Sequence, residues 1–282
     1  MKKTALFLIA LIAVFAVGAI FVACNPVNIF EGNTFSFSYD DCALYTVADR
    51  GEVPTVFSSL EVEWYNGAVV VEQSEESSQV EFFEISEGEK VTPATTMHYF
   101  LDGDTLRIKY AKSGRLSVGR LKKFLYVRIP VGFALSSIDL NSVSADVLAE
   151  DITVGRAECS SVSGSISLRC NASEVNADNV SGAVRIDTSA AAVNVDTVSG
   201  AITVFCRETL STLGIDSVSG SIVLRIAESV GFSLKYDTVS GILVNAFSEK
   251  TDKQGNLYVY GDGGCSYGVT NVSGRLTIEE CV

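Results

Sequence analysis

The chain has 282 residues, of which 47% are hydrophobic and 9% aromatic, with 23 Gly and only 4 Pro. This composition predicts an ordered protein with enough apolar residues for one large domain or two small ones. Its 34 acidic and 21 basic residues give a net charge of −13, and no basic stripe offsets it, which argues against nucleic acid as a partner.

The first 24 residues have the pattern of a membrane-targeting segment. Two lysines precede an uncharged apolar run from Thr4 to Ala23, which is long enough to cross a bilayer as a helix. Phe21-Val22-Ala23-Cys24 also resembles a bacterial lipobox, in which the cysteine is lipidated, although Leu is usual where Phe21 stands. We therefore expect residues 1–24 to be a signal or anchor segment that tethers the protein to the extracytoplasmic face of the cell membrane. The tether is either a lipid on Cys24 or an uncleaved helix.

The next part of the chain is irregular. Residues 25–58 mix strand-like alternation with Gly and Pro, and we expect a linker and a capping strand there. Residues 59–135 are expected to form irregular rungs of a β-solenoid that spans 59–282. The pattern is clearest at Leu60–Val71, where apolar residues alternate and change parity just before Gly67.

Two further segments precede the regular repeats. Tyr99–Tyr110 is expected to be another rung, with a bend at Asp102-Gly103-Asp104 and with Leu106 and Ile108 inside. Lys112–Lys123 is rich in Lys and Arg, and we expect it to be a solvated loop, with contact to acidic lipid head groups as the alternative.

Residues 136–282 repeat the phrase Val-Ser-Gly. Its copies start 18 to 21 residues apart, except for a last gap of 33, at Val143 (an imperfect copy), Val162, Val180, Val198, Val218, Val239 and Val272. Apolar residues alternate on both sides of the phrase and the parity slips at it, which predicts strand, corner and strand. Stacking such units predicts an all-β fold, a β-solenoid with rungs about 4.8 Å apart.

This interpretation makes specific predictions for each rung. The Val of each phrase should point inward and its Ser outward, while the Gly should lie at a corner crowded by adjacent rungs. Because the chain ends soon after Ile278, the last rung should be the C-terminal edge of the solenoid.

These features resemble a known family. The repeated phrase, together with Val127-Arg128-Ile129-Pro130-Val131-Gly132 and Gly103-Asp104-Thr105-Leu106-Arg107-Ile108, resembles the bacterial putative-adhesin family of unknown function, also called the toastrack domain. The resemblance covers roughly residues 60–282. It implies a membrane-anchored extracytoplasmic β-solenoid that acts in adhesion or as a scaffold in envelope-stress signalling, without catalytic residues. The family usually has Asp after the Gly, a position held here by Ser165, Ala183, Ala201, Ser221, Ile242 and Arg275, so any role of that acid is absent.

One acidic column could carry chemistry. The residue two before the Val of a phrase is Asp178, Asp196, Asp216 or Asp237 in four copies. Stacked rungs would place these carboxylates roughly 5 Å apart, a spacing at which Ca²⁺ could bind. Each Asp can instead accept backbone N–H groups at its own bend, and the glycine-rich signature of calcium-binding β-rolls is missing. We therefore expect no metal site and no cofactor.

Catalysis is not expected either. A column of serines stacks beside the acidic one (Ser144, Ser163, Ser181, Ser199, Ser219, Ser240 and Ser273), but the only histidine is His98, which lies far outside the repeats. Cys170 and Cys206 should lie two rungs apart, beyond disulfide reach, whereas Cys265 and Cys281 could pair.

Three classes of function remain. The first is a non-catalytic adhesion or interaction scaffold at the cell envelope, whose partner is an envelope protein or polymer. The second is an accessory of an envelope-stress signalling system, which would need a separate transmembrane partner. The third and least favoured is a polysaccharide-active β-helix enzyme, because residues 150–245 show neither long loops nor convergent catalytic groups. No small-molecule substrate is indicated.

Overall fold

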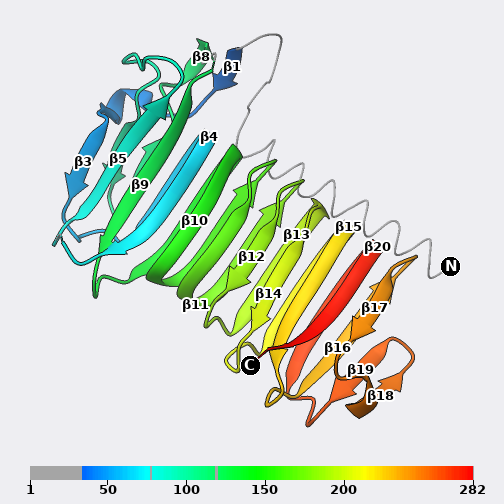
Figure 1. Cartoon of the computed structure of the whole chain (residues 1–282). Coiled ribbons are helices and arrows are strands. Elements are labelled where there is room, and N and C mark those ends of the chain that lie inside the picture. Colours follow the sequence, from blue (N-terminus) through cyan, green and yellow to red (C-terminus); the bar gives the residue numbers. More distant parts are fainter. Residues whose placement is uncertain (1–33, 77, 118–119, 282) are drawn as a thin grey trace.

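The computed structural model of the chain describes residues 34–76, 78–117 and 120–281. The anchor segment expected at residues 1–24, including Cys24, lies outside these residues. The described chain is all-β: twenty strands and two short 3-10 helices, with no α-helix. Nothing in this part of the chain forms a helix that could cross a membrane. Figure 1 shows the strands as one long row, with β3, β5 and β9 at one end and β16–β19 at the other.

The strands have the following bounds. Before the regular repeats they are β1 (Thr34–Phe37), β2 (Thr46–Val47), β3 (Arg50–Val53), β4 (Ser59–Ser74), β5 (Val80–Glu87), β6 (His98–Asp102), β7 (Thr105–Lys109), β8 (Gly114–Ser117) and β9 (Lys122–Pro130). The repeats contain β10 (Leu135–Ser161), β11 (Ile166–Asn179), β12 (Val184–Asp187), β13 (Ala192–Ser199), β14 (Ile202–Cys206), β15 (Thr212–Ala227), β16 (Phe232–Thr238), β17 (Ile242–Asn245), β18 (Thr251–Gln254), β19 (Leu257–Tyr260) and β20 (Cys265–Cys281). The 3-10 helices are η1 (Cys42–Leu44) and η2 (Ser248–Lys250).

The regular rungs belong to one 18-stranded sheet that bends at each corner, so each rung contributes one strand segment to each of its two halves. We call the strands before the Val-Ser-Gly corner the pre-corner sheet and those after it the post-corner sheet. Neighbouring rungs pair in parallel and in register: Val195 of β13 lies beside Ile215 of β15, and Ile202 of β14 lies beside Ile222 of the same β15. The period-2 alternation of each strand turns one row of apolar side chains inward, so the core runs between the two sheets.

The corner differs from the sequence prediction at the valine. The residue before each Val is polar and points inward: Asn179 is 0% exposed, and Thr197 and Ser217 are buried as well. The Val that follows is only partly buried in every copy. The prediction that the Val points inward is therefore wrong. At the Asn179 corner the physical reason is that the backbone needs a polar partner in the core, because the Asn179 amide accepts from Gly182 N–H and donates to Gly164 O. The Thr197 and Ser217 hydroxyls have no hydrogen-bond partner among the described residues.

The serine and the glycine of the phrase each have a structural role. Ser181 Oγ donates a hydrogen bond to Val162 O of the preceding rung at 3.1 Å, and the same contact recurs along the stack. A Cβ on Gly220 would collide with the carbonyl oxygen of Gly200, and Gly220 also has a φ of +141°. The prediction that Gly occupies a crowded corner is confirmed.

At both ends of the solenoid the order of rungs in space departs from their order in the chain. β20, the last strand, pairs in parallel with β15 on one side and with β16 and β17 on the other. The hairpin of β18 and β19 covers β16 instead. At the other end β4 lies between β10 and the later strands β7 and β9. The prediction that the last rung forms the C-terminal edge is therefore wrong.

The rung expected at Tyr99–Tyr110 is an antiparallel hairpin of β6 and β7. Gly103, with a φ of +58°, supplies the left-handed residue that a two-residue hairpin loop needs, so the chain reverses there instead of turning a solenoid corner. Leu106 and Ile108 are fully buried, as expected. Together with β2, this hairpin closes the N-terminal end of the pre-corner sheet.

Candidate functional site

The predicted aspartate column is only partly continuous. Asp178, Asp196 and Asp216 are register partners on three successive rungs of the pre-corner sheet. Because β20 is inserted between β15 and β16, Thr270 stands between Asp216 and Asp237. Asp237 accepts a hydrogen bond from Asn256 Nδ2 at 2.7 Å. Among the described residues, no three His, Cys, Asp or Glu side chains are grouped so that they could hold a metal ion.

The column borders a groove on the outer face of the pre-corner sheet, which we call the acidic groove. Its volume is about 620 Å³. It crosses several rungs, because its lining comes from β4, β10, β11 and β13: Glu61, Glu63, Asp139, Asn141, Arg156, Glu158, Cys159, Ser160, Glu174, Asn176, Asp178, Asn194 and Asp196. Arg156 is the one basic residue in this lining, and it forms ion pairs with Glu158 at 2.6 Å and with Glu174 at 3.6 Å.

The carboxylates of the groove repel one another. Burial, followed by the nearby Glu158, raises the pKa of Asp139 to about 6. Burial, followed by Asp178 and Asp216, also raises the pKa of Asp196 to about 6. Both shifts mean that the ionised forms lack sufficient positive charge nearby. A cation in the groove would relieve this repulsion.

An aromatic pocket adjoins the acidic groove at its N-terminal end. Its volume is about 380 Å³, and Glu61 and Glu63 line both cavities. Its aromatic wall is a chain of rings, with Tyr39 and Tyr45 centroids 4.8 Å apart and Tyr45 and Phe100 centroids 5.5 Å apart. The polar lining comprises Ser38, Asp40, Asp41, Asp102, Arg107 and Lys109 in addition to the two shared glutamates.

Both basic side chains of the aromatic pocket already have acidic partners. Lys109 Nζ lies 2.7 Å from Glu63 Oε1, and Arg107 lies 3.3 Å from both Glu61 and Asp102. Glu63 Oε2, by contrast, is buried and has no hydrogen-bond partner among the described residues. The pocket therefore keeps an unpartnered acceptor at its junction with the groove.

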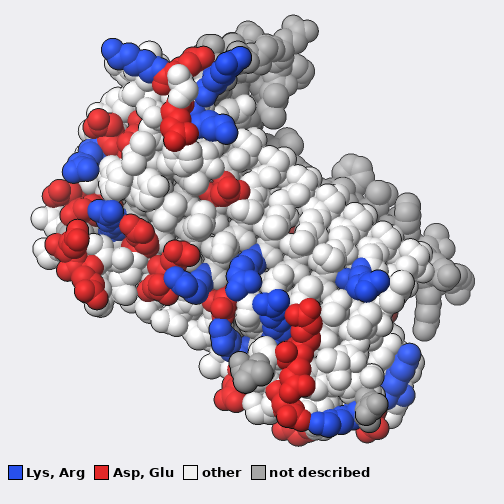
Figure 2. Space-filling view, in the orientation of Figure 1, with Lys and Arg blue, Asp and Glu red and all other residues white. Residues whose placement is uncertain are grey.

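A second depression lies at the opposite edge of the strands, where one rung returns to the next. It is about 450 Å³ in volume, and its ion pairs join Arg169 to Asp151 at 2.9 Å and Arg207 to Asp187 at 2.6 Å. Figure 2 shows that charged side chains gather toward one long edge of the visible face, while uncharged surface covers much of the middle of the row. The two arginines and Asp151 are more than half exposed, so these ion pairs add little to stability or selectivity.

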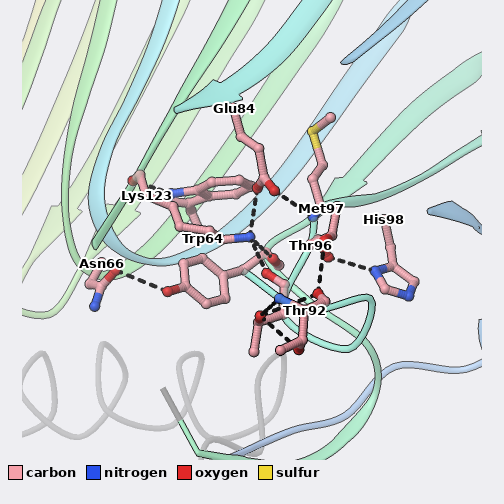
Figure 3. A network of polar contacts seen from close by, with 10 residues as sticks. Trp64, Asn66, Glu84, Thr92, Thr96, Met97, His98 and Lys123 are labelled. Carbon is pink, nitrogen blue, oxygen red and sulfur yellow. Dashed lines mark hydrogen bonds and ion pairs between the residues drawn. The ribbon is translucent and has the colours of Figure 1, made fainter. Parts of the chain in front are cut away.

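A buried ionic cluster lies inside the first rungs (Figure 3). Lys123 is fully buried, and its Nζ donates to Glu84 Oε2 at 2.6 Å, to Thr95 O at 2.7 Å and to Tyr110 O. The same ammonium lies 4.8 Å from the centre of the Trp64 ring. The prediction of a solvated loop over Lys112–Lys123 is wrong at β8, which pairs with β1, and at Lys123, which is the second residue of β9. Lys123, Leu125, Val127 and Ile129 share one parity, and all four point inward.

This cluster is internal to the fold. Burial lowers the pKa of Lys123 to about 8 and raises the pKa of Glu84, while the attraction between the two opposes both shifts. All three Nζ donors are used, so the ammonium is stabilised as a structural link between strands. Trp64 occupies the register position of Ser142, and its Nε1 donates to Lys123 O at 2.9 Å. Trp64 thus takes the place of the inward polar residue of a regular corner. This is the corner that the change of parity before Gly67 predicted.

Comparison with known proteins identifies the family. The family model described as Toastrack DUF4097 matches residues 57–241, which is more than half of the chain. The chain belongs to the toastrack DUF4097 family. No protein of curated function matches it.

Several solved structures are similar to this toastrack chain. One is a putative cell adhesion protein from Clostridium sporogenes, 14% identical, with 84% of this chain and 100% of that one covered and a TM-score of 0.36. Another is a putative adhesin from Bacteroides fragilis, 12% identical, with 82% and 96% covered and a TM-score of 0.43. A third is a putative lipid binding protein from Parabacteroides distasonis, 13% identical, with 81% and 95% covered and a TM-score of 0.33.

The remaining residues singled out in the sequence of this toastrack chain have structural surroundings. His98 is buried at the start of β6, with its Nδ1 2.8 Å from Thr96 O. Cys265 and Cys281, whose pairing the sequence left open, are both free thiols. Cys170 and Cys206 are buried and free, as expected.

The sequence interpretation missed most of the acidic groove. It identified the column of Asp178, Asp196 and Asp216 but not the second column, to which Asp139 and Glu158 belong. The signal was available, because Asp139 and Glu158 lie two residues before Asn141 and Ser160, which line the groove with them. Period-2 alternation places residues two apart on the same face of a strand. The aromatic pocket carried no such signal, because Tyr39 and Phe100 meet only through the folding of the N-terminal cap.

Proposed function

We propose that the chain is a non-catalytic, membrane-anchored scaffold that acts in adhesion or protein interaction at the extracytoplasmic face of the cell envelope. The observation that carries this proposal is the acidic groove, a continuous outward-facing cavity built on in-register parallel strands. Side chains on such a sheet are held at fixed spacing, which favours recognition of an extended partner. Membership of the toastrack family supports the same function.

We also propose a division of the chain into four segments. Residues 1–24 are the anchor segment, with Cys24 as the lipidation site or with an uncleaved helix. Residues 25–58 are a linker and a capping strand, residues 59–135 are irregular rungs and residues 136–282 are the regular rungs. The apolar run from Thr4 to Ala23 between two lysines and Cys24 supports the anchor.

The anchor is tested by fractionation. The full-length chain should be recovered with membranes, and deletion of residues 1–24 should release it. Labelling with a fatty acid that is lost in Cys24→Ala would identify a lipid, whereas membrane recovery without label would identify a helix. A full-length chain found only in the cytoplasm contradicts the anchor.

The interaction surface is tested by site-specific crosslinking in intact cells. A photoreactive amino acid at Ser160, which lines the acidic groove, should give discrete adducts. The same amino acid at Glu52, an exposed position on β3, serves as the control and should give none. Adducts at Glu52 but not at Ser160 would place the binding surface elsewhere.

A further inference from the structure

We propose that the acidic groove and the aromatic pocket together bind an extended basic peptide, with one Lys or Arg side chain of that peptide held in the aromatic pocket. This rests on the proposed scaffold function, and it specifies the chemistry of the partner.

The aromatic pocket has the character of a site for an organic cation. Aromatic faces attract ammonium and guanidinium groups, and the pocket already holds one such contact, because Lys109 Nζ lies 5.7 Å from the centre of the Tyr39 ring. Tyr45 and Phe100 continue the ring chain beyond Tyr39. Five carboxylates line this pocket against two basic side chains: Asp40, Asp41, Glu61, Glu63 and Asp102 against Arg107 and Lys109. Because Arg107 and Lys109 are paired with acidic groups, an incoming cation meets a net negative site.

The junction of the two cavities supplies an acceptor for that cation. Glu63 lines both cavities, and its Oε2 is buried without a hydrogen-bond partner among the described residues. A buried carboxylate oxygen that lacks a partner carries a desolvation cost that a donated N–H would remove. The Glu63 side chain is 19% exposed and lies at this junction, which is where a Lys or Arg head group would be held.

The acidic groove continues from this junction as a track for further cations. Its carboxylates recur from rung to rung, about 4.8 Å apart. Alternate side chains on one face of an extended peptide are about 6.6 Å apart, so several basic side chains can each reach a carboxylate. Burial, and after it the neighbouring carboxylates, raises the pKa values of Asp139 and Asp196, so a cation placed beside them would be favourable. A single metal ion fits less well, because no three acidic side chains of the described chain are grouped to hold one.

The test measures binding of fluorescein-labelled deca-lysine to the full-length chain in nonionic detergent, by fluorescence anisotropy. Asp178→Asn combined with Asp196→Asn should weaken binding at least tenfold. The matched control, Glu52→Gln combined with Asp252→Asn, removes two exposed carboxylates on β3 and β18 and should change binding less than twofold. Equal weakening by both pairs would mean that deca-lysine responds only to net charge, which overturns the proposal.

The aromatic pocket is tested without any change of charge. Tyr45→Leu keeps an apolar side chain but removes the ring, and it should weaken deca-lysine binding about threefold or more. If Tyr45→Leu binds deca-lysine as tightly as the parent does, the aromatic pocket does not hold a basic side chain of the peptide. Each variant should first show the parent's far-UV circular dichroism. If the double groove variant does not fold, Asn194→Arg, which adds a cation at an exposed position in the groove, should give the same loss of binding.

Failure of this inference and failure of the scaffold function give different results. If deca-lysine does not bind, while crosslinking at Ser160 still gives adducts and the chain fractionates with membranes, the basic peptide is wrong and the scaffold remains. If crosslinking and fractionation also fail, both proposals are wrong.

Discussion

At the scale of single residues, the recurring phrase is explained by four adjacent positions. The inward polar residue bonds the corner backbone in four of the seven copies, the Val faces partly outward, the Ser bonds a carbonyl of the neighbouring rung, and the Gly lies in a crowded position. The stacked glycines leave no room for a Cβ. Their contacts follow from the close approach of parallel rungs.

Glycine substitutions can separate a steric effect from a conformational one. A Cβ on Gly164 would collide with the carbonyl oxygen of Ala145 although its φ is not left-handed, whereas Gly103 has a φ of +58° and open space around it. Gly164→Ala should therefore destabilise the protein by roughly 3 kcal/mol or more, and Gly103→Ala by only about 1 kcal/mol. Urea denaturation followed by circular dichroism measures both. Equal effects would contradict the steric explanation of the phrase.

The inward polar residue should matter more than the valine beside it. Asn179→Ala leaves Gly182 N–H and Gly164 O buried without partners, which should cost about 3 kcal/mol. Val180→Ala removes a partly exposed side chain and should cost about 1 kcal/mol. The same denaturation experiment compares them. A larger loss of unfolding free energy in Val180→Ala than in Asn179→Ala would support the sequence prediction that the valine points inward.

The sequence could predict the corner but not which residue of it points inward. Alternation identifies the strands on each side of the phrase, and the change of parity identifies the bend. At the bend itself two neighbouring residues compete for the inward position, and hydrophobicity alone selects the Val. The structure selects the polar neighbour. Where that residue bonds the corner backbone, as Ser161 and Asn179 do, the reason is that a buried backbone group without a partner costs more than a half-exposed valine.

At the scale of elements, the pre-corner strands bring like charges together. Parallel in-register pairing places Asp178, Asp196 and Asp216 beside one another, since identical positions of successive repeats become neighbours. Water screens the exposed Asp216, whereas Asp178 and Asp196 are partly buried and their pKa values are raised, first by burial and then by neighbouring carboxylates. A binding groove is thus produced by the same register that builds the core.

Burial of Asp196, together with the neighbouring Asp178 and Asp216, predicts a pH-dependent gain in stability for Asp196→Asn. The pKa of Asp196 is raised from 3.8 to about 6, so the folded state binds its proton more tightly than the unfolded state does. The stabilisation of the folded state by proton binding at Asp196 is fully present below about pH 3.8 and is lost as the pH rises through 6. Asp196→Asn should therefore raise the melting temperature at pH 7.5 and leave it unchanged at pH 3.5. Partial exposure screens the effect, so the gain should be roughly 2–4 °C at most.

Thermal unfolding at both pH values checks this prediction. Asp252→Asn, at an exposed position on the outermost strand β18, is the matched control and should change neither melting temperature. High salt should reduce the gain in Asp196→Asn by screening the neighbouring carboxylates. A gain at pH 3.5 would point to packing instead of charge.

At the scale of the whole molecule, both ends of the solenoid exchange the order of their rungs. β4 and β20 are central strands, although they come first and last among the rungs along the chain. The phrase at Val272 carries no mark of this insertion, because it resembles every other copy. Local periodicity therefore predicts the rung itself, whereas its place in the stack depends on long-range pairing. The gap of 33 residues before Val272 was the only indication that the chain leaves the stack and returns to it.

The inserted rung predicts where proline is harmful near the C-terminus. Thr277 of β20 lies between Val223 of β15 and Val244 of β17, so its backbone is paired on both sides. Thr277→Pro should cost roughly 3 kcal/mol or more, because proline removes a ladder hydrogen bond in a central strand. Lys253→Pro, on β18, is the matched control and should cost about 1 kcal/mol or less, since β18 pairs only with β19. Urea denaturation compares the two variants, and hydrogen exchange should show β20 amides as protected as those of β15. If Thr277→Pro is as mild as Lys253→Pro, or β20 exchanges as fast as β18, the last rung is an edge after all.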